Sequence, residues 1–119
     1  IEALPDAAIL VNVSNDAWFG DSAAPHQHLQ MARMRAIEAG RYLLRATNTG
    51  ITAIINEKGN LVAAIPQFTP ITLTGNAVLF EGMTPYARGS NYPVLLVLFV
   101  VLVLAVSLQR QNSRRISLE

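Results

Sequence analysis

The chain has 119 residues, of which 51% are hydrophobic and 14% are charged, and its formal net charge is +1. This length fits one modest domain, and a charge so close to zero excludes the broad basic surface of a nucleic-acid-binding protein. Because cysteine is absent, the chain has no disulfide, no thiolate metal site and no thiol nucleophile. The excess of apolar residues lies near the C-terminus, so the sequence divides into two parts near residue 91.

The first predicted element is a strand at residues 7–13, with the sequence AAILVNV. A nearly continuous apolar run of this length is typical of a strand covered on both faces, and Asn12 is its one exception. The polar loop SNDAWFGD at residues 14–21 follows. Its Asn and Asp side chains suit a tight turn, but the carboxyl ends of strands are also where α/β folds bind ligands. Composition leaves both interpretations open.

A helix is predicted next, with Ser22 as its N-cap, Pro25 in its first turn and Gly40 as its C-terminal stop. At 100° per residue, one apolar arc of this helix comprises Leu29, Ala32, Ala36, Ile37 and Ala39. Arg33 falls inside that arc. Since a buried guanidinium is costly unless paired, we expect Arg33 to reach water or to meet a carboxylate from elsewhere in the fold.

Three further strands are predicted by the period of the hydrophobic pattern, at residues 42–47, 51–56 and 61–66. The turn EKGN joins the last two, and its glycine supplies the positive φ that a hairpin needs. The tripeptide NTG at residues 48–50 predicts a bend, and residues 77–80 form one more possible strand. A strand, a helix and then several strands predict an α/β fold with a mixed sheet.

The C-terminal run at residues 92–108, YPVLLVLFVVLVLAVSL, carries no charge. As a helix it is about 25 Å long, at the short end of the range for crossing a bilayer. A buried core helix is the alternative, but the few residues that follow could not cover it, so we interpret the run as a membrane anchor. Because Arg110, Arg114 and Arg115 follow it and only Arg88 closely precedes it, the positive-inside rule places the globular part outside the cytoplasm.

Other patterns of chemically active residues are weak. His26 and His28 are two apart, so on a helix they point in nearly opposite directions and cannot share a metal ion. Ser, His and Asp all occur in the first thirty residues, but no G-x-S-x-G sequence frames a nucleophilic serine. Glu38 is interpreted as a surface ion pair with Arg35 or as a support for a nearby site. The sequence predicts neither a metal nor a cofactor.

Longer segments of the sequence resemble a known family. The stretches SNDAWFGDS, PHQHLQMARMRAIE and TPYARGSN together make the chain, from about Leu10 to Leu108, similar to the C-terminal part of the bacterial apolipoprotein N-acyltransferases, within the nitrilase or carbon-nitrogen hydrolase superfamily. The resemblance implies the C-terminal part of a nitrilase-like α-β-β-α sandwich, followed by one C-terminal transmembrane helix. The fold class is thus α/β, carried in that family on a bundle of membrane helices.

The resemblance also implies an activity. Members of the family move an acyl chain from a phospholipid to the amino group of a diacylglyceryl cysteine at a lipoprotein's N-terminus. They use a Glu base, a Lys that stabilises the oxyanion and a Cys nucleophile that carries the acyl group as a thioester. The implied partners are the phospholipid donor, the diacylglyceryl lipoprotein and the bilayer, with no nucleic acid. The implied location is the bacterial inner membrane, with the globular part in the periplasm and the C-terminus in the cytoplasm.

The catalytic residues of that family cannot be carried over to this chain. Its nucleophile lies in a Cys-Tyr-Glu motif upstream of the first predicted strand, and the single lysine here, Lys58, sits in a hairpin turn. We therefore expect these 119 residues to be the C-terminal piece of a longer protein, inactive alone. The resemblance implies that this piece supplies a wall of the site: Ser14, Asn15, Asp16, Trp18 and Phe19 as lining residues, with Arg33 and Glu38 as supporting residues.

The expected organisation is a nitrilase-like portion at residues 1–91, a transmembrane helix at residues 92–109 and a cytoplasmic tail at residues 110–119. Two alternatives to the acyltransferase remain open. One is a nitrilase-type amidase. The other is a non-catalytic module, tethered to the membrane, that binds lipid or lipoprotein.

Overall fold

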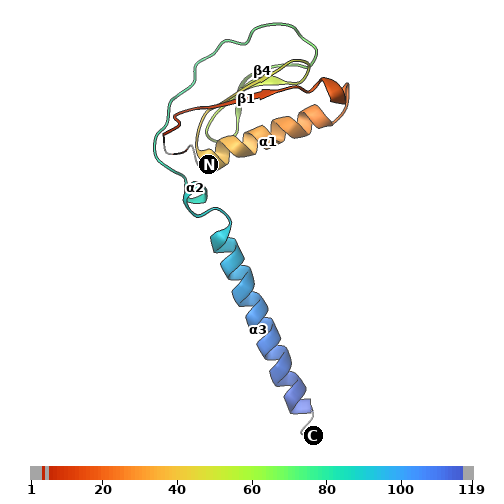
Figure 1. Ribbon diagram of the computed structural model, residues 1–119, viewed down its shortest axis with the longest axis vertical. Helices are drawn as coiled ribbons and strands as arrows, with labels where there is room; N and C mark the ends of the chain where they lie inside the picture. The colour runs from red at the N-terminus through yellow and green to blue at the C-terminus, as the bar shows by residue number, and fades with distance from the viewer. Residues whose placement is uncertain (1–3, 5, 117–119) are drawn as a thin grey trace. The chain divides into compact units, whose positions relative to one another are not determined.

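The computed structural model describes residues 4 and 6–116 and contains two compact units, Ile1–Arg88 and Gly89–Glu119. The first unit is a four-stranded sheet with helices, and the second is mainly one long helix (Figure 1). The elements are β1 (Leu10–Ser14), the 3-10 turn η1 (Ala17–Phe19), α1 (Ala24–Ala39), β2 (Leu43–Thr47), β3 (Thr52–Ile55), β4 (Leu61–Ile65), α2 (Pro85–Gly89) and α3 (Tyr92–Ile116).

The sheet is mixed, as the sequence predicts, with strand order β1-β2-β3-β4. β1 and β2 are parallel and are joined through α1, while β2, β3 and β4 pair antiparallel. A parallel pair requires such a crossover connection, whereas a tight turn suffices for each antiparallel pair. Since β4 therefore runs in the same direction as β1 and β2, the carboxyl ends of these three strands lie at one edge of the sheet. Loops that follow them can form a common site.

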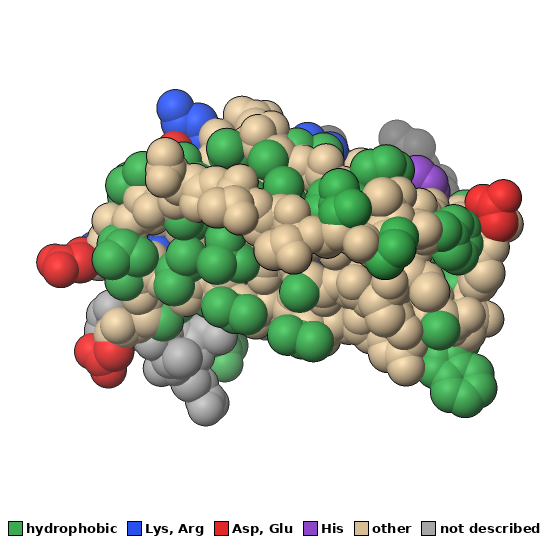
Figure 2. Space-filling model, turned by 90° about the horizontal axis from the view of Figure 1, so that it is seen from above, with side chains coloured by type: hydrophobic (Ala, Val, Ile, Leu, Met, Phe, Trp, Pro, Cys, Tyr) green, Lys and Arg blue, Asp and Glu red, His purple; other side chains and the backbone are tan. Residues whose placement is uncertain are grey.

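The expectation that the first strand is covered on both faces is wrong for the described residues. β1 begins three residues later than predicted and alternates in burial, with Val11 67% and Val13 79% exposed. The physical reason is that α1 covers one face of the sheet only. In the view from above, hydrophobic side chains are spread over the visible face and most charged side chains lie near its rim (Figure 2).

Helix α1 has the predicted first-turn proline and the predicted C-terminal stop. Pro25 lies in its first turn, and Gly40 closes it in the left-handed conformation, at φ 62°. The predicted N-cap is wrong by one residue, because Ala23 occupies that position without a side-chain bond, although Ser22 Oγ accepts a hydrogen bond from the Ala24 amide at 3.3 Å. Ile37 was expected on the buried arc but is 45% exposed.

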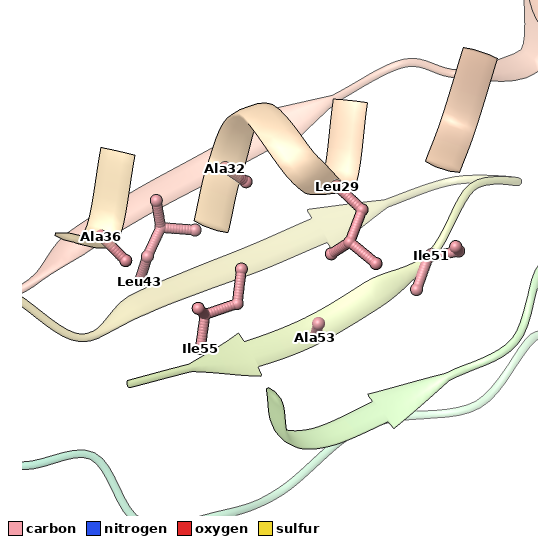
Figure 3. Packing of buried hydrophobic residues seen from close by; sticks show 7 residues of the cluster. All are labelled: Leu29, Ala32, Ala36, Leu43, Ile51, Ala53 and Ile55. Carbon is pink, nitrogen blue, oxygen red and sulfur yellow. The ribbon is translucent and has the colours of Figure 1, made fainter. Parts of the chain in front are cut away.

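The main core lies between α1 and the sheet (Figure 3). It is formed by buried side chains from α1, from β2 and from β3 with the residue before it: Leu29, Ala32, Ala36, Leu43, Ile51, Ala53 and Ile55. Alanines at the contact let the helix backbone approach the strands closely, and they leave little side-chain entropy to lose. The apolar arc predicted from the sequence therefore packs α1 against the sheet, although Ile37 does not belong to this core.

The two hairpin features of the second half are confirmed. Gly59 takes φ 76° in the turn between β3 and β4, and residues 48–50 bend between β2 and β3. The possible strand at residues 77–80 is not formed. Residues 66–84 instead form an irregular segment. Its backbone amides donate hydrogen bonds to other parts of the first unit, from Phe68 to the carbonyl of Thr49 at 3.1 Å and from Phe80 to the carbonyl of Ala8 at 3.2 Å. The proline and glycine residues of this stretch do not favour a regular ladder.

Arg41 fastens the segment before α2 to the rest of the first unit. Its buried guanidinium donates to the carbonyl of Ala7 at 2.7 Å and to that of Gly82 at 2.6 Å. Thr84 adds a bond from its hydroxyl to the carbonyl of Glu38. Ala7 and Gly82 are far apart in the sequence. Arg41 therefore ties two segments of the chain together by donating hydrogen bonds to their backbone carbonyls.

Helix α3 is the one described helix that is long and apolar enough to cross a membrane. Its window Tyr92–Gln109 has a mean hydropathy of 2.5, and none of that window is buried within the structure. A core helix of a soluble domain would be mostly buried, so this alternative is disfavoured. Because this helix is identified by its length and composition alone, its orientation in a membrane stays a prediction.

Candidate functional site

The loop that follows β1 is built around one buried carboxylate. Asp16 is 1% exposed, although it stands in a loop at the carboxyl edge of the sheet. Its Oδ1 accepts hydrogen bonds from Ser14 Oγ at 2.7 Å and from His28 Nδ1 at 3.0 Å. Its Oδ2 accepts from Arg45 Nη2 at 2.8 Å. Because an ionised carboxylate only accepts hydrogen bonds, the proton of the His28 ring must sit on Nδ1 in this contact.

These contacts change the acidity of Asp16. Burial by itself raises the pKa of a carboxyl group, but the hydrogen bonds from Ser14 and His28 and the charges of Arg45 and His28 outweigh it. The pKa of Asp16 is therefore lowered from its ordinary 3.8. At neutral pH the group is an ionised structural centre and has no proton to donate.

Arg45 is the partner that connects two strands to the loop. It stands opposite Asn12 in the parallel register of β1 and β2, and its Nη1 donates to Asn12 Oδ1 at 2.5 Å. Its Nε is buried without a partner among the described residues. The sequence contains a signal for this pair, since Asn12 and Arg45 each interrupt an otherwise apolar strand, but register is needed to bring them together.

The loop backbone is held by two asparagines. Asn15 Oδ1 accepts from the Ala17 amide at 3.1 Å and from Asn48 Nδ2 at 2.8 Å. Asn48 Oδ1 accepts from the Asp16 amide at 3.0 Å. Gly50 packs against the Asp16 carboxylate so closely that an added Cβ atom would overlap it. The bend at residues 48–50 is thus part of the loop's framework, a role that no local pattern in the sequence indicates.

The aromatic residues of the loop lie outside this polar framework. Trp18 is 87% exposed, and Phe19 is 41% exposed. Phe19 stands edge-on to His28, with ring centroids 5.0 Å apart and an interplanar angle of 87°, a favourable arrangement for aromatic rings. The structure therefore separates the five predicted lining residues into two sets: Ser14, Asn15 and Asp16 in the framework, and Trp18 and Phe19 at the surface.

The two predicted supporting residues lie elsewhere on α1. Arg33 Nε donates to the carbonyl of Gly59 at 2.6 Å, and its Nη1 donates to Gln30 Oε1 at 3.2 Å. Arg33 thus meets a backbone carbonyl in the β3–β4 turn, where the sequence suggested water or a carboxylate. Glu38 forms a partly exposed ion pair with Arg35 at 2.6 Å. Neither is hydrogen-bonded to the Asp16 network among the described contacts.

The geometry does not support a Ser-His-Asp triad. Asp16 binds both Ser14 and His28, whereas a triad requires the histidine to accept the proton of the serine. Over residues 4 and 6–116, no group of three or more His, Asp or Glu side chains is placed to hold a metal ion. The arrangement is suited instead to presenting a rigid loop. A hollow of about 210 Å³ beside it is lined in part by Asn12, Ser14 and His28.

Comparisons with known proteins identify relatives of this chain. The sequence pattern of the carbon-nitrogen hydrolases matches residues 1–79. The apolipoprotein N-acyltransferase of Nitrosomonas europaea is 52% identical over 115 residues, which are 97% of this chain and 23% of that protein. That of Methylococcus capsulatus is 50% identical over 113 residues, 95% of this chain and 22% of that protein. That of Pasteurella multocida is 57% identical over 86 residues, which are 72% of this chain and 16% of that protein. The chain thus spans less than a quarter of the length of these relatives.

Proposed function

Because the chain belongs to the carbon-nitrogen hydrolase family, we propose that it is part of a membrane acyltransferase for bacterial lipoproteins. In this proposal the enzyme takes an acyl chain from a phospholipid and transfers it to the amino group of a diacylglyceryl cysteine. The observation that carries the proposal is the 52% identity, over 97% of the chain, to a relative named apolipoprotein N-acyltransferase. The exposed apolar helix α3 supports a membrane setting.

The proposed reaction has two acyl transfers. A cysteine thiolate attacks the phospholipid ester carbonyl, which forms a thioester and releases the lysophospholipid. The substrate amine then attacks the thioester, which forms the amide and returns the thiol. A Glu base and a Lys that stabilises the oxyanion complete the proposed set of catalytic residues. Because residues 1–119 contain no cysteine, the nucleophile of this reaction would come from outside this sequence.

The proposed role of the described loop is to form a wall of the site. The Asp16 network would fix the loop backbone, and the exposed Trp18 and Phe19 would present apolar surface to an acyl chain or to the membrane boundary. Two facts support this division: Asp16 is almost completely buried, and Trp18 is almost completely exposed. An exposed aromatic on a rigid turn loses little conformational entropy when it binds a ligand.

The proposed architecture is an α-β-β-α sandwich in which a second sheet covers the face of β1 opposite α1. The exposed Val11 and Val13 on that face support a second layer. The proposed location is the inner membrane, with the globular unit in the periplasm and the C-terminus in the cytoplasm. The three arginines after the apolar run support that orientation.

A direct assay of the protein that contains this chain tests the proposed function. The purified protein, in phospholipid micelles, should acylate a synthetic peptide whose N-terminal cysteine carries diacylglyceryl, and mass spectrometry should find one added acyl chain. Alkylation of thiols before the assay should abolish the transfer. A protein that leaves the peptide unmodified, with all components present, would refute the proposal.

A nitrilase-type amidase is the second candidate, because the matching family is described as carbon-nitrogen hydrolases. The same assay separates the two, since an amidase would release ammonia from a simple amide and would not modify the diacylglyceryl peptide. A non-catalytic tethered module would do neither, but would retain binding of lipid or lipoprotein.

A further inference from the structure

A second hollow lies at the same edge of the sheet as the Asp16 loop. It has a volume of about 570 Å³ and is lined by Asp21, His26, Ile51, Ala64, Ile65, Pro66, Gln67 and Phe68. Its walls are the start of α1, the residue before β3, and the end of β4 with the three residues that follow. Pockets for small ligands commonly have volumes of about 300 to 1,000 Å³.

The chemistry of the walls selects an apolar ligand. Most lining side chains are apolar, and Asp21 is the one lining residue with a fixed charge. Among the described lining residues there is no lysine or arginine to neutralise a phosphate. A lipid headgroup phosphate would therefore meet a carboxylate and no strong cation, whereas a hydrocarbon chain would remove apolar surface from water.

The segment after β4, which lines the pocket, is held in an unusual conformation. Phe68 has φ 59°, in the left-handed region that residues other than glycine seldom adopt. Its amide donates to the carbonyl of Thr49 at 3.1 Å, which fastens the segment to the β2–β3 bend. The residue remains 55% exposed. Backbone strain of this kind is commonly retained where it positions a side chain for ligand binding.

Across the pocket, α1 is joined to the same segment. His26 Nε2 and Gln67 Nε2 lie 3.0 Å apart in a side-chain hydrogen bond. The pocket thus has a polar link on one side and the Phe68 ring on another, and both are held by contacts between separate elements. The hollow is thus an open surface pocket of the first unit, bounded by these two contacts.

We propose that this pocket, here called the Phe68 pocket, binds the hydrocarbon part of an acyl chain while that chain is being transferred. The proposal rests on the proposed function for its ligand, because the transferred group is then a fatty acyl chain. Its location is independent of the Asp16 network. The pocket and the loop share the carboxyl edge of the sheet, and Asp21 belongs both to the pocket lining and to the segment that leads from the loop into α1.

Photo-crosslinking tests the location directly. A phospholipid with a diazirine near the end of one acyl chain is added to the full protein in nanodiscs of otherwise unlabelled lipid, and labelled peptides are mapped by mass spectrometry. The Phe68 pocket predicts label within residues 64–68. Label confined to the membrane helix and to other surfaces would overturn the proposal.

Two variants and one matched control test the pocket by its size. Ala64→Leu places extra carbons in the pocket, whereas Ala63→Leu adds the same carbons on the neighbouring residue of β4, which does not line it. Phe68→Gly removes the ring and suits the positive φ, so it should not destabilise the fold. We expect Ala64→Leu to lower transfer from a dipalmitoyl donor about tenfold relative to a dioctanoyl donor, and both pocket variants to lose label within residues 64–68.

The outcomes separate this proposal from the proposed function. Two results would overturn the pocket and leave the acyltransferase proposal standing. In the first, folded Ala64→Leu and Phe68→Gly transfer from the dipalmitoyl and dioctanoyl donors in the same ratio as the unaltered protein. In the second, this ratio shifts equally in the control Ala63→Leu. Label in the pocket without any transfer by the unaltered protein would support the pocket as a hydrocarbon site and refute the acyltransferase.

Discussion

The carboxylate of Asp16 lies 2.8 Å from the guanidinium of Arg45, and their side chains are 0% and 3% exposed. This buried pair joins the loop after β1 to β2, so the loop that carries Trp18 is tied to the sheet. Removing one partner of a buried pair is costly, because the other charge then stays buried without its counter-charge. The predictions below concern the protein that contains this chain, purified in detergent.

Replacing Asp16 with Asn should destabilise the fold strongly. The substitution leaves the Arg45 charge buried without a counter-charge, so the free energy of unfolding should fall by about 3 to 5 kcal/mol. Chemical unfolding followed by circular dichroism measures this. The control is Asp21→Asn, an exposed acid of the same region, which should change stability by less than about 0.5 kcal/mol. Equal effects of the two variants would contradict a structural role for the buried pair.

Replacing Gly50 with Ala should act through Asp16. The new Cβ would overlap the Asp16 carboxylate, and such overpacking typically costs about 1 to 3 kcal/mol. Gly20→Ala is the control, because Gly20 also resists substitution, through its φ of 52°, but nothing lies within 4 Å of an added Cβ. In double-mutant cycles with Asp16→Ala, which removes the overlapping carboxylate, the Gly50 variant should be non-additive and the Gly20 variant additive. Additivity in both would refute the contact.

Stability should decrease in acid because the pKa of Asp16 is lowered in the folded state. The folded protein then binds this proton less readily than the unfolded chain does. The contribution of Asp16 to stability is therefore complete above the ordinary pKa of 3.8 and is lost as the pH falls through the lower folded pKa. Unfolding curves at a series of pH values should show the difference between the unaltered protein and Asp16→Asn shrinking in this range. A constant difference would count against this assignment.

Replacing Trp18 with Ala should separate activity from stability. Since the side chain is 87% exposed, the free energy of unfolding should change by less than about 0.5 kcal/mol. If Trp18 contacts the acyl chain or the membrane boundary, acyl transfer should fall about tenfold. Val62→Ala, an exposed apolar residue on β4, is the control and should leave the rate unchanged. A parallel loss of folded protein and activity would instead assign Trp18 to packing.

Replacing Arg41 with Met should loosen the segment before α2. The buried guanidinium donates to carbonyls of Ala7 and Gly82, and each carbonyl left unpaired costs about 1 to 3 kcal/mol. Hydrogen exchange should then become faster around residues 80–88. Arg35→Met, at an exposed position, should not change exchange there. Protection that is unchanged in Arg41→Met would show that other contacts hold this segment.

Much of the fold follows from local patterns. The period of the apolar residues predicted α1, β2, β3 and β4, and the glycines at positions 40 and 59 marked the ends and turns because only glycine adopts their positive φ easily. The prediction failed where a local pattern depends on what packs against it. Residues 77–80 have the composition of a short strand but find no partner strand. The apolar run at residues 7–13 predicts a strand covered on both faces, although α1 covers only one face of the sheet.

The candidate site shows the same division. The sequence alone identified the polar loop with its tryptophan, the apolar C-terminal helix and the resemblance to lipoprotein acyltransferases, because each is a contiguous pattern. Only the tertiary structure decided that Asp16 is the centre of the loop. Its partners Arg45, Asn48 and Gly50 stand about thirty residues away along the chain, and strand pairing between β1 and β2 brings them to it. Register is a long-range property, so no local pattern predicts which polar residues will meet.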